Sequence, residues 1–277
     1  MNNINAIKFI SEGISTISLA KIGESSSVSL EYSYNGVDWR DWDLSDLTIK
    51  SSDTLFIRGY NPSGFNSNYI NFHIFTIKGD KVSCSGNIMS LIDYKTLPDT
   101  IPCDYCFYVL FSGCTALTTA PELPATELKD GCYFGMFEGC SSLKVAPELP
   151  AKTLKEWCYA YMFFECYSLT SASKLPAKTL AVRCYIDMFS GCTALTTAPE
   201  LPATELADCC YYQMFSRCTA LTTAPELPAT TLAKFCYGFM FSGCSSLKTR
   251  PKLYAKTPAY RCYYDMFEGC TALKTTH

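Results

Sequence analysis

Cysteine is the residue whose placement in this chain most suggests chemistry. Seventeen of the 277 residues are cysteine, and fourteen of them form two series that each repeat every 26 residues. Thiols at regular spacing can form disulfides, hold a metal ion or fill a core. The fourteen are Cys106, Cys114, Cys132, Cys140, Cys158, Cys166, Cys184, Cys192, Cys210, Cys218, Cys236, Cys244, Cys262 and Cys270.

We expect these cysteines to be structural core residues with free thiols. Disulfide frameworks belong to small secreted chains that cannot form a core, whereas this chain is long and 48% hydrophobic. Cys103-x-x-Cys106 is the only Cys-x-x-Cys pair, and His73 and His277 are the only histidines. Zinc sites combine more such ligands than this pattern brings together. The sequence therefore predicts no metal site and no cofactor.

Aromatic residues recur in the same register and are the best candidates for a ligand-binding surface. One series directly follows the first cysteine of each repeat: Phe107, Tyr133, Tyr159, Tyr185, Tyr211, Tyr237 and Tyr263. We expect it to pack between repeats with its hydroxyl groups at water. A second series occupies the next two positions: Tyr108, Phe134, Tyr161, Tyr212, Phe239 and Tyr264. Exposed rings with polar tips suit recognition of sugars or proteins, and packing between repeats is the alternative.

A third series is acidic and lies within the Pro-rich segment of the repeat. Its members are Glu122, Glu148, Glu200 and Glu226, and Lys174 and Lys252 occupy the same register. Stacked like charges repel one another unless they extend into water, so a solvated face is the default interpretation. A docking strip for a partner is the alternative.

No residues stand apart as a catalytic site. The chain has no Ser-His-Asp arrangement, no glycine-rich phosphate loop and no acidic pair outside the repeating series. The stretch from Ser33 to Trp39 is faintly similar to the Asp-box of sialidases, which leaves a small hydrolase in the N-terminal region as a minor alternative. We therefore expect a non-enzyme.

The repeat itself predicts an α+β solenoid of seven 26-residue coils. In the repeat at 132–157, Cys132 and Met136 lie one helical turn apart, and Gly139 would end a short helix. A strand through Leu143 and Ala146 would follow, with the prolines at an edge or a turn. Because one such unit cannot bury its own apolar face, each coil must stack on the next.

The first 82 residues lack this repeat and alternate apolar and polar residues, which is typical of β-strands. Runs at 14–19 and 28–34 precede Asn35-Gly36, a dipeptide that favours a hairpin turn. Further strands are expected at 47–50, 54–60 and 69–78. We therefore predict a small all-β sandwich at residues 1–82 as an anchoring or spacer domain. The solenoid would occupy 83–277, with an N-terminal cap at 83–105.

One motif of the repeat resembles a known family. Phe-x-Gly-Cys-x-x-Leu occurs from Phe111 to Leu117 and from Phe137 to Leu143. It is similar to the BspA-like leucine-rich repeats, which occur on surface proteins of Bacteroides, Treponema and relatives and in Bacteroides phages. The resemblance covers about 84–277 and implies a leucine-rich-repeat domain with a role in adhesion. The repeat here is longer than is usual in that family, and it carries a second cysteine.

Charge and hydrophobicity exclude two classes of partner. The net charge is −3 without a basic stripe, which argues against nucleic acid. No stretch approaches the ~18 apolar residues of a membrane span, so membrane insertion is not expected. The first residues do not form a signal peptide, so we expect synthesis in the cytosol and a final location on a virion or a cell surface.

These observations lead to one functional hypothesis and one alternative. We expect a non-enzymatic adhesion protein whose repeated face recognises a protein or glycan on a cell surface. The alternative is a structural component of a phage virion, such as a fibre, decoration or tail-associated host-recognition protein, with other virion proteins as partners. A coil that ends directly before Thr275-Thr276-His277 would also permit homo-oligomers.

Overall fold

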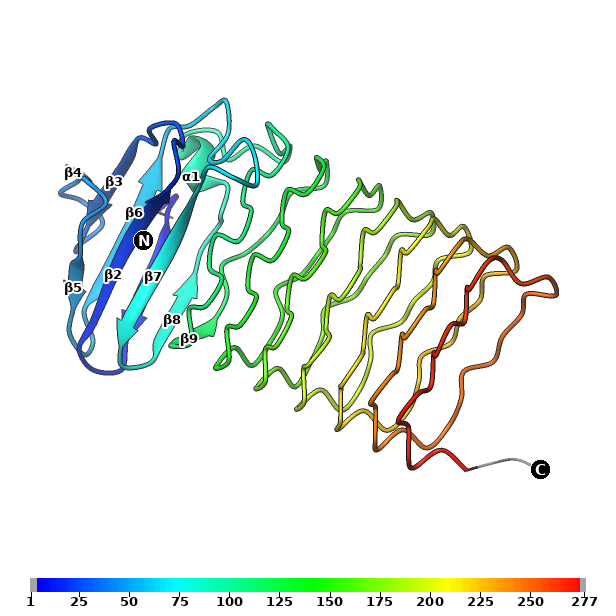
Figure 1. Cartoon of the computed structure of the whole chain (residues 1–277). Coiled ribbons are helices and arrows are strands. Elements are labelled where there is room, and N and C mark those ends of the chain that lie inside the picture. Colours follow the sequence, from blue (N-terminus) through cyan, green and yellow to red (C-terminus); the bar gives the residue numbers. More distant parts are fainter. Residues whose placement is uncertain (1–3, 275–277) are drawn as a thin grey trace.

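The computed structural model describes residues 4–274. Two kinds of structure follow one another along the chain: β-sheets near the N-terminus and then a stack of similar coils (Figure 1). The elements are β1 (Ile7–Ser11), β2 (Ser15–Ile22), β3 (Leu30–Ser33), β4 (Arg40–Asp41), β5 (Leu47–Ile49), β6 (Thr54–Gly59), β7 (Phe72–Gly79), β8 (Val82–Ser85), α1 (Ser90–Asp93) and β9 (Leu117–Thr119). Thr275-Thr276-His277, the residues that follow the last predicted coil, lie outside the described residues.

The N-terminal strands form two sheets. One has six strands in the order β4-β3-β6-β1-β8-β9, and the other has three in the order β5-β2-β7. Burial alternates along β2 and β7, because each strand turns one face toward a shared core. Phe9 on β1 and Phe75 on β7 meet in that core with ring centroids 5.8 Å apart. The last strand, β9, already belongs to the first coil and pairs with β8 in parallel.

The prediction of an α+β solenoid is wrong. Among residues 4–274, α1 is the only helix, and it precedes the first coil. Where a helical turn was expected, the backbone takes a positive φ at every fourth residue, as at Gly131, Gly135 and Gly139 (58°, 57° and 67°). A right-handed helix cannot contain such angles. Apolar residues recur in pairs every four positions, and over nine residues this spacing mimics the helical period of 3.6.

A ribbon of turns replaces the helix and uses its backbone groups in alternation. The amide of every second residue donates to a carbonyl of the following coil, as from Phe107 to Cys132 at 2.8 Å. The amides between them donate three residues back within their own coil, as from Tyr108 to Tyr105 at 3.0 Å. Each interface between adjacent coils therefore has five such inter-coil bonds, all donated by the earlier coil. This alternation satisfies the backbone without a helix or a sheet.

The strand expected in each coil is also reduced. Among the described residues, only the first coil has a strand, β9, and later coils are joined in this register by isolated parallel bridges such as Val145 with Ser171 and Thr223 with Thr249. Proline lacks an amide donor, so the Pro-rich segments interrupt any continuous ladder here.

The β-sheets supply the layer on which the first coil stacks. Phe75 of β7 lies parallel to Phe111, with centroids 4.9 Å apart and planes 8° apart, and so begins the phenylalanine column of the coils. The amides of Phe75 and Asn66 donate to first-coil carbonyls at 2.8 and 3.0 Å. On the other side, Ile101 donates to the carbonyl of Glu127 at 2.9 Å. Residues 83–105 thus cover one side of the first coil and residues 65–77 the other, while the predicted domain boundary near 82 stays a prediction.

Candidate binding groove

Six aromatic side chains line one groove of about 420 Å³. They come from the connection between β6 and β7 and from the first three coils: Tyr69, Tyr105, Tyr108, Phe134, Trp157 and Tyr161. Tyr69 is 57% exposed, and the other five are half-buried. Concave surfaces lined by aromatic residues are the usual form of a ligand site. Three of the six belong to the second aromatic series predicted from the sequence.

The rings form a continuous chain of contacts across the groove. Tyr69 meets Tyr105 at 5.5 Å and 63°, and Tyr105 meets Tyr108 at 6.0 Å and 78°. Tyr108 stacks on Phe134 at 5.3 Å. Phe134 in turn lies 5.9 Å from Trp157 and 5.2 Å from Tyr161. The contacts are edge-on at the Tyr69 end, stacked between Tyr108 and Phe134, and tilted between Phe134 and its two other neighbours.

Three groove residues adopt backbone angles that disfavour large side chains. Tyr105, Trp157 and Tyr161 have φ values of 53°, 58° and 56°. In the second coil, Gly131 and Gly135 occupy the same positions of the repeat. A bulky residue in this region costs on the order of 1 kcal/mol, and the same register has a positive φ in later coils too, as at Arg183 and Phe235. The fold accepts glycine at these positions, so the rings are not needed to build the coil.

Carboxylates surround the tyrosine end of the groove. Burial raises the pKa of Tyr105, and the charges of Asp130, Asp104 and Glu156 raise it further. The three acids follow one another along the repeat: the Asp104 carboxylate accepts from the amide of Asp130 at 3.1 Å, and the Asp130 carboxylate accepts from the amide of Glu156 at 3.0 Å. Burial and the charge of Glu138 likewise raise the pKa of Tyr108.

Asp187 lies at the other end of the groove and is almost fully buried. Burial raises its pKa to about 6, and the nearby hydroxyl groups of Ser190 and Tyr161 and the charge of Arg217 lower the pKa in part. Its carboxylate also contributes to the raised pKa of Tyr161, which is about 12 and has burial as the main cause. Asp187 occupies the position that Tyr161 holds one coil earlier, so it interrupts the series of rings.

The remaining members of the second aromatic series form a separate cluster near the C-terminal end. Tyr212 meets Phe239 at 5.6 Å, and Phe239 meets Tyr264 at 5.1 Å. Phe235 and Tyr260 extend this cluster. The structure therefore splits the predicted series in two: Tyr108, Phe134 and Tyr161 lie in the groove, and Tyr212, Phe239 and Tyr264 do not.

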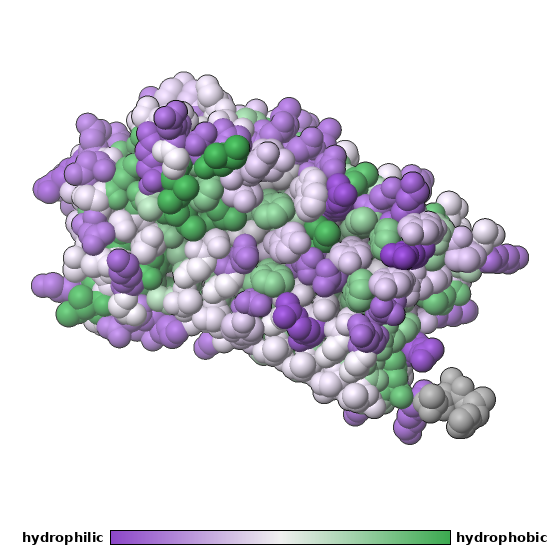
Figure 2. Space-filling view, viewed as in Figure 1, coloured by the Kyte–Doolittle hydropathy of each residue, from purple (hydrophilic) through white to green (hydrophobic). Residues whose placement is uncertain are grey.

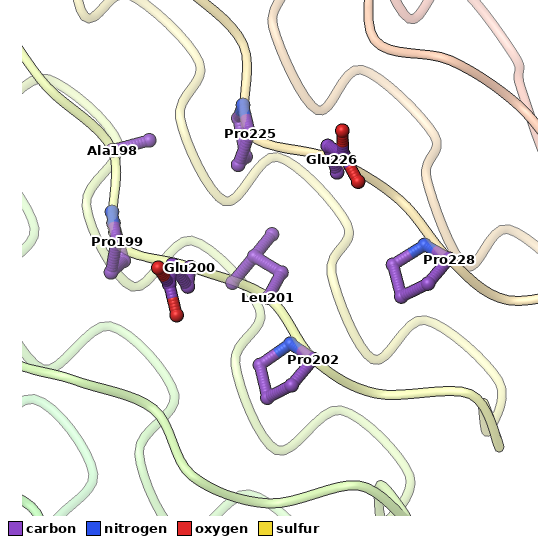
Figure 3. A pocket seen from close by; sticks show the side chains of 8 residues that line it. All are labelled: Ala198, Pro199, Glu200, Leu201, Pro202, Pro225, Glu226 and Pro228. Atoms are coloured by element: carbon purple, nitrogen blue, oxygen red, sulfur yellow. The ribbon is translucent and has the colours of Figure 1, made fainter.

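The acidic series lies on another side of the coils. Glu122, Glu148, Glu200 and Glu226 are all exposed. They line two similar proline-walled grooves of about 330 and 320 Å³, the first between Glu122 and Glu148 and the second between Glu200 and Glu226. Figure 3 shows the second groove, with Glu200 and Pro202 on one coil and Glu226 and Pro228 on the next. Lys174 occupies the same register between the two grooves, so the negative strip is not continuous.

The first aromatic series is core, and one expectation about it is wrong. The rings from Tyr133 to Tyr237 stack at 5.8–5.9 Å and are at most 2% exposed. The hydroxyl groups of Tyr133 and Tyr237 do not reach water as expected, because both are buried without a hydrogen-bond partner in the described residues. A phenol hydroxyl is expected to face water, but ring stacking holds these two hydroxyl groups inside the column.

The fourteen repeat cysteines are also buried, and all have free thiols. From the second coil onward, the second cysteine donates to a phenylalanine carbonyl of the preceding repeat, as from Cys140 to Phe111 at 3.1 Å. Burial raises the pKa of Cys140 well above its usual value. A neutral thiol that donates a hydrogen bond suits this interior.

Three groove residues, Tyr69, Tyr105 and Trp157, were not predicted from the sequence. Tyr69 gives no pattern, because it comes from a connection outside the repeat. Tyr105 and Trp157 do leave a trace, since they occupy a repeat position that is otherwise Gly131, Arg183, Cys209, Phe235 and Arg261. That variability at a fixed position marks an outward-facing site.

Other classes of site are missing from the part of the chain that the structure describes. No group of three or more His, Cys, Asp or Glu side chains within 4–274 is placed to hold a metal ion. Within the same residues, no helix has the length and apolar character needed to cross a membrane. Figure 2 shows hydrophilic side chains scattered along the visible face of the coils, and hydrophobic ones gathered mainly over the end of the molecule where the β-sheets lie.

Comparison of the chain with protein-family models, curated proteins and solved structures gives no match. The resemblance to the BspA-like repeats therefore stays a prediction, and the site must be interpreted from its own geometry.

Proposed function

We propose that this protein is a non-enzymatic binding protein whose aromatic groove recognises a partner on a cell surface. The observation that carries the proposal is that six aromatic side chains line one concave site. They come from the β6–β7 connection and from the first three coils. Aromatic residues are enriched where proteins bind other molecules, because they bury a large area at a low cost in side-chain entropy.

The backbone supports the same conclusion. Trp157 and Tyr161 hold positive φ values at positions where the neighbouring coil has glycine. Folding alone does not favour large rings there. Because Gly131 and Gly135 fill the same positions in the preceding coil, the coil does not need these rings, and binding is a role that would use them.

The test measures binding by the full chain and by a groove variant. Labelled protein is applied to an array of extracellular-matrix proteins and of mammalian and bacterial glycans. We expect binding to at least one probe, and a loss of at least about tenfold in affinity with Trp157→Gly, since a central aromatic contact is worth about 1.4 kcal/mol or more. Gly131 shows that the fold accepts glycine in this register.

Phe235→Gly is the matched control, because Phe235 holds the same register position but belongs to the C-terminal cluster. It should leave binding unchanged. Equal loss in both variants would indicate a general effect on the fold. Unchanged binding by the Trp157→Gly variant would contradict the proposal that the groove is the binding site.

A further inference from the structure

The protein itself shows how its aromatic clusters accommodate a cation. In the C-terminal cluster, the guanidinium carbon of Arg261 lies 5.9, 5.4 and 5.0 Å from the ring centroids of Phe235, Tyr260 and Tyr264. Guanidinium groups are attracted to the negative faces of aromatic rings. This cluster is therefore already occupied by a side chain of the same protein.

The N-terminal sheets hold a second example, with a carboxylate added. Arg58 lies 3.7 Å from the ring centroid of Trp39 and 4.0 Å from that of Tyr94. Its Nε atom donates to Glu31 at 2.8 Å. A guanidinium between rings and next to a carboxylate is thus a stable arrangement in this molecule.

The aromatic groove has the same components but lacks a central cation of its own. Arg183 reaches only one side, where it lies 4.9 Å from the Trp157 ring and 3.7 Å from Glu156. Tyr69, Tyr105, Tyr108 and Phe134 have no guanidinium or ammonium group over their rings among the described residues.

The charges around the groove favour a positive ligand. The carboxylates whose fields reach its tyrosines are Asp104, Asp130, Glu138, Glu156 and Asp187. Lys129 and Lys155 line a different groove, beside Glu127. Aromatic faces and carboxylates both attract cations, so their effects add.

We propose that the aromatic groove binds an arginine side chain within an exposed basic segment of a protein partner. The inference rests on the proposed function and names its ligand. Arginine fits better than lysine because its planar group stacks on rings and donates to two carboxylate oxygens at once. A neutral sugar would use the rings but would gain little from the surrounding negative charge.

The test compares three peptides that differ only in charge and shape. Labelled Gly-Ser peptides with two arginines, two lysines or two citrullines are titrated with the full protein, and anisotropy reports binding. Citrulline keeps the planar shape of arginine without its charge. We expect the arginine peptide to bind at least ten times more tightly than the citrulline peptide and more tightly than the lysine peptide. Its affinity should fall as salt is raised.

Two variants show whether the groove is the site of binding. Trp157→Gly and Glu138→Gln should each weaken the arginine peptide severalfold, whereas Phe235→Gly should not. Equal loss with Phe235→Gly, or no loss with Trp157→Gly, would mean that the peptide binds the acidic surface at large and would overturn the inference.

The remaining outcomes separate this inference from the proposed function. If the citrulline peptide binds as tightly as the arginine peptide, the cation inference fails while the groove remains a binding site. If a neutral glycan binds instead and depends on Trp157, the inference fails and the proposed function stands. If no peptide and no array probe depends on Trp157, both fail.

Discussion

Two buried hydroxyl groups interrupt an otherwise apolar column. The hydroxyls of Tyr133 and Tyr237 have no hydrogen-bond partner among the described residues, and burying a polar group without a partner costs about 1–3 kcal/mol. Phe107 occupies the same register in the first coil. We expect Tyr133→Phe to raise the free energy of unfolding by about 1 kcal/mol, measured by urea denaturation. Tyr263→Phe is the control, since that ring is only partly buried, and a gain of equal size there would contradict the explanation.

Asp187 should make stability depend on pH. Because burial raises its folded-state pKa from 3.8 to about 6, the folded protein holds this proton more tightly than the unfolded chain does. Its contribution to stability is therefore lost as pH rises through about 6 and is restored as pH falls toward 4. We expect Asp187→Asn to raise the free energy of unfolding at pH 8 by about 2 kcal/mol. Denaturation from pH 4 to 8 should show this gain vanish near pH 4, and a constant gain would exclude the ionised carboxylate as the cause.

Part of the groove could be predicted from residue types alone. Tyr108, Phe134 and Tyr161 could be chosen because an aromatic series in a fixed register is visible in one chain. The sequence could not predict that these three rings are separated from Tyr212, because the separation depends on the buried Asp187 in the coil between them. The contribution of Tyr69 depends on how the β-sheets meet the coils.

At the scale of the element, the 26-residue coil is a unit that can be removed whole. Deleting 210–235 joins Cys209 to Cys236 and would place Tyr237 over Tyr185, since the register is kept. We expect a folded, shorter protein with one cooperative thermal transition, measured by circular dichroism. Deleting only 210–222 breaks the register and should abolish this transition. Equal behaviour of the two deletions would contradict independent stacking of the coils.

The conformation of the coil was harder to predict than its length. The strands of the N-terminal sheets lie close to the predicted ranges, as β6 (Thr54–Gly59) does to 54–60, because alternation identifies a half-buried strand. The coil segment instead pairs its apolar residues every four positions. Glycine marks the positive φ values only in some coils, and Arg217 or Phe239 takes that conformation elsewhere, so no single repeat reveals it.

The whole molecule has one core that runs from the β-sheets into the coils. Phe75 of β7 stacks on Phe111, and a single buried cluster extends from Ile7 to Cys270. The sequence predicted two regions joined by a cap at 83–105, but it gave no sign of the contact between Phe75 and Phe111, since that contact pairs a strand residue with a coil residue that share no repeat. The groove lies at this junction, where Tyr69 meets Tyr105, so its shape depends on both regions.

Within the ribbon of turns, the uniform direction of the inter-coil hydrogen bonds gives the stack an electrical polarity. Five columns of bonds run through the coils, and every bond points from an earlier amide to a later carbonyl. Aligned peptide dipoles add, as they do along a helix. Each coil therefore turns amide donors of this ribbon toward the coil after it and carbonyl acceptors toward the coil before it, so the ribbon carries a macrodipole whose positive end points toward the later coils.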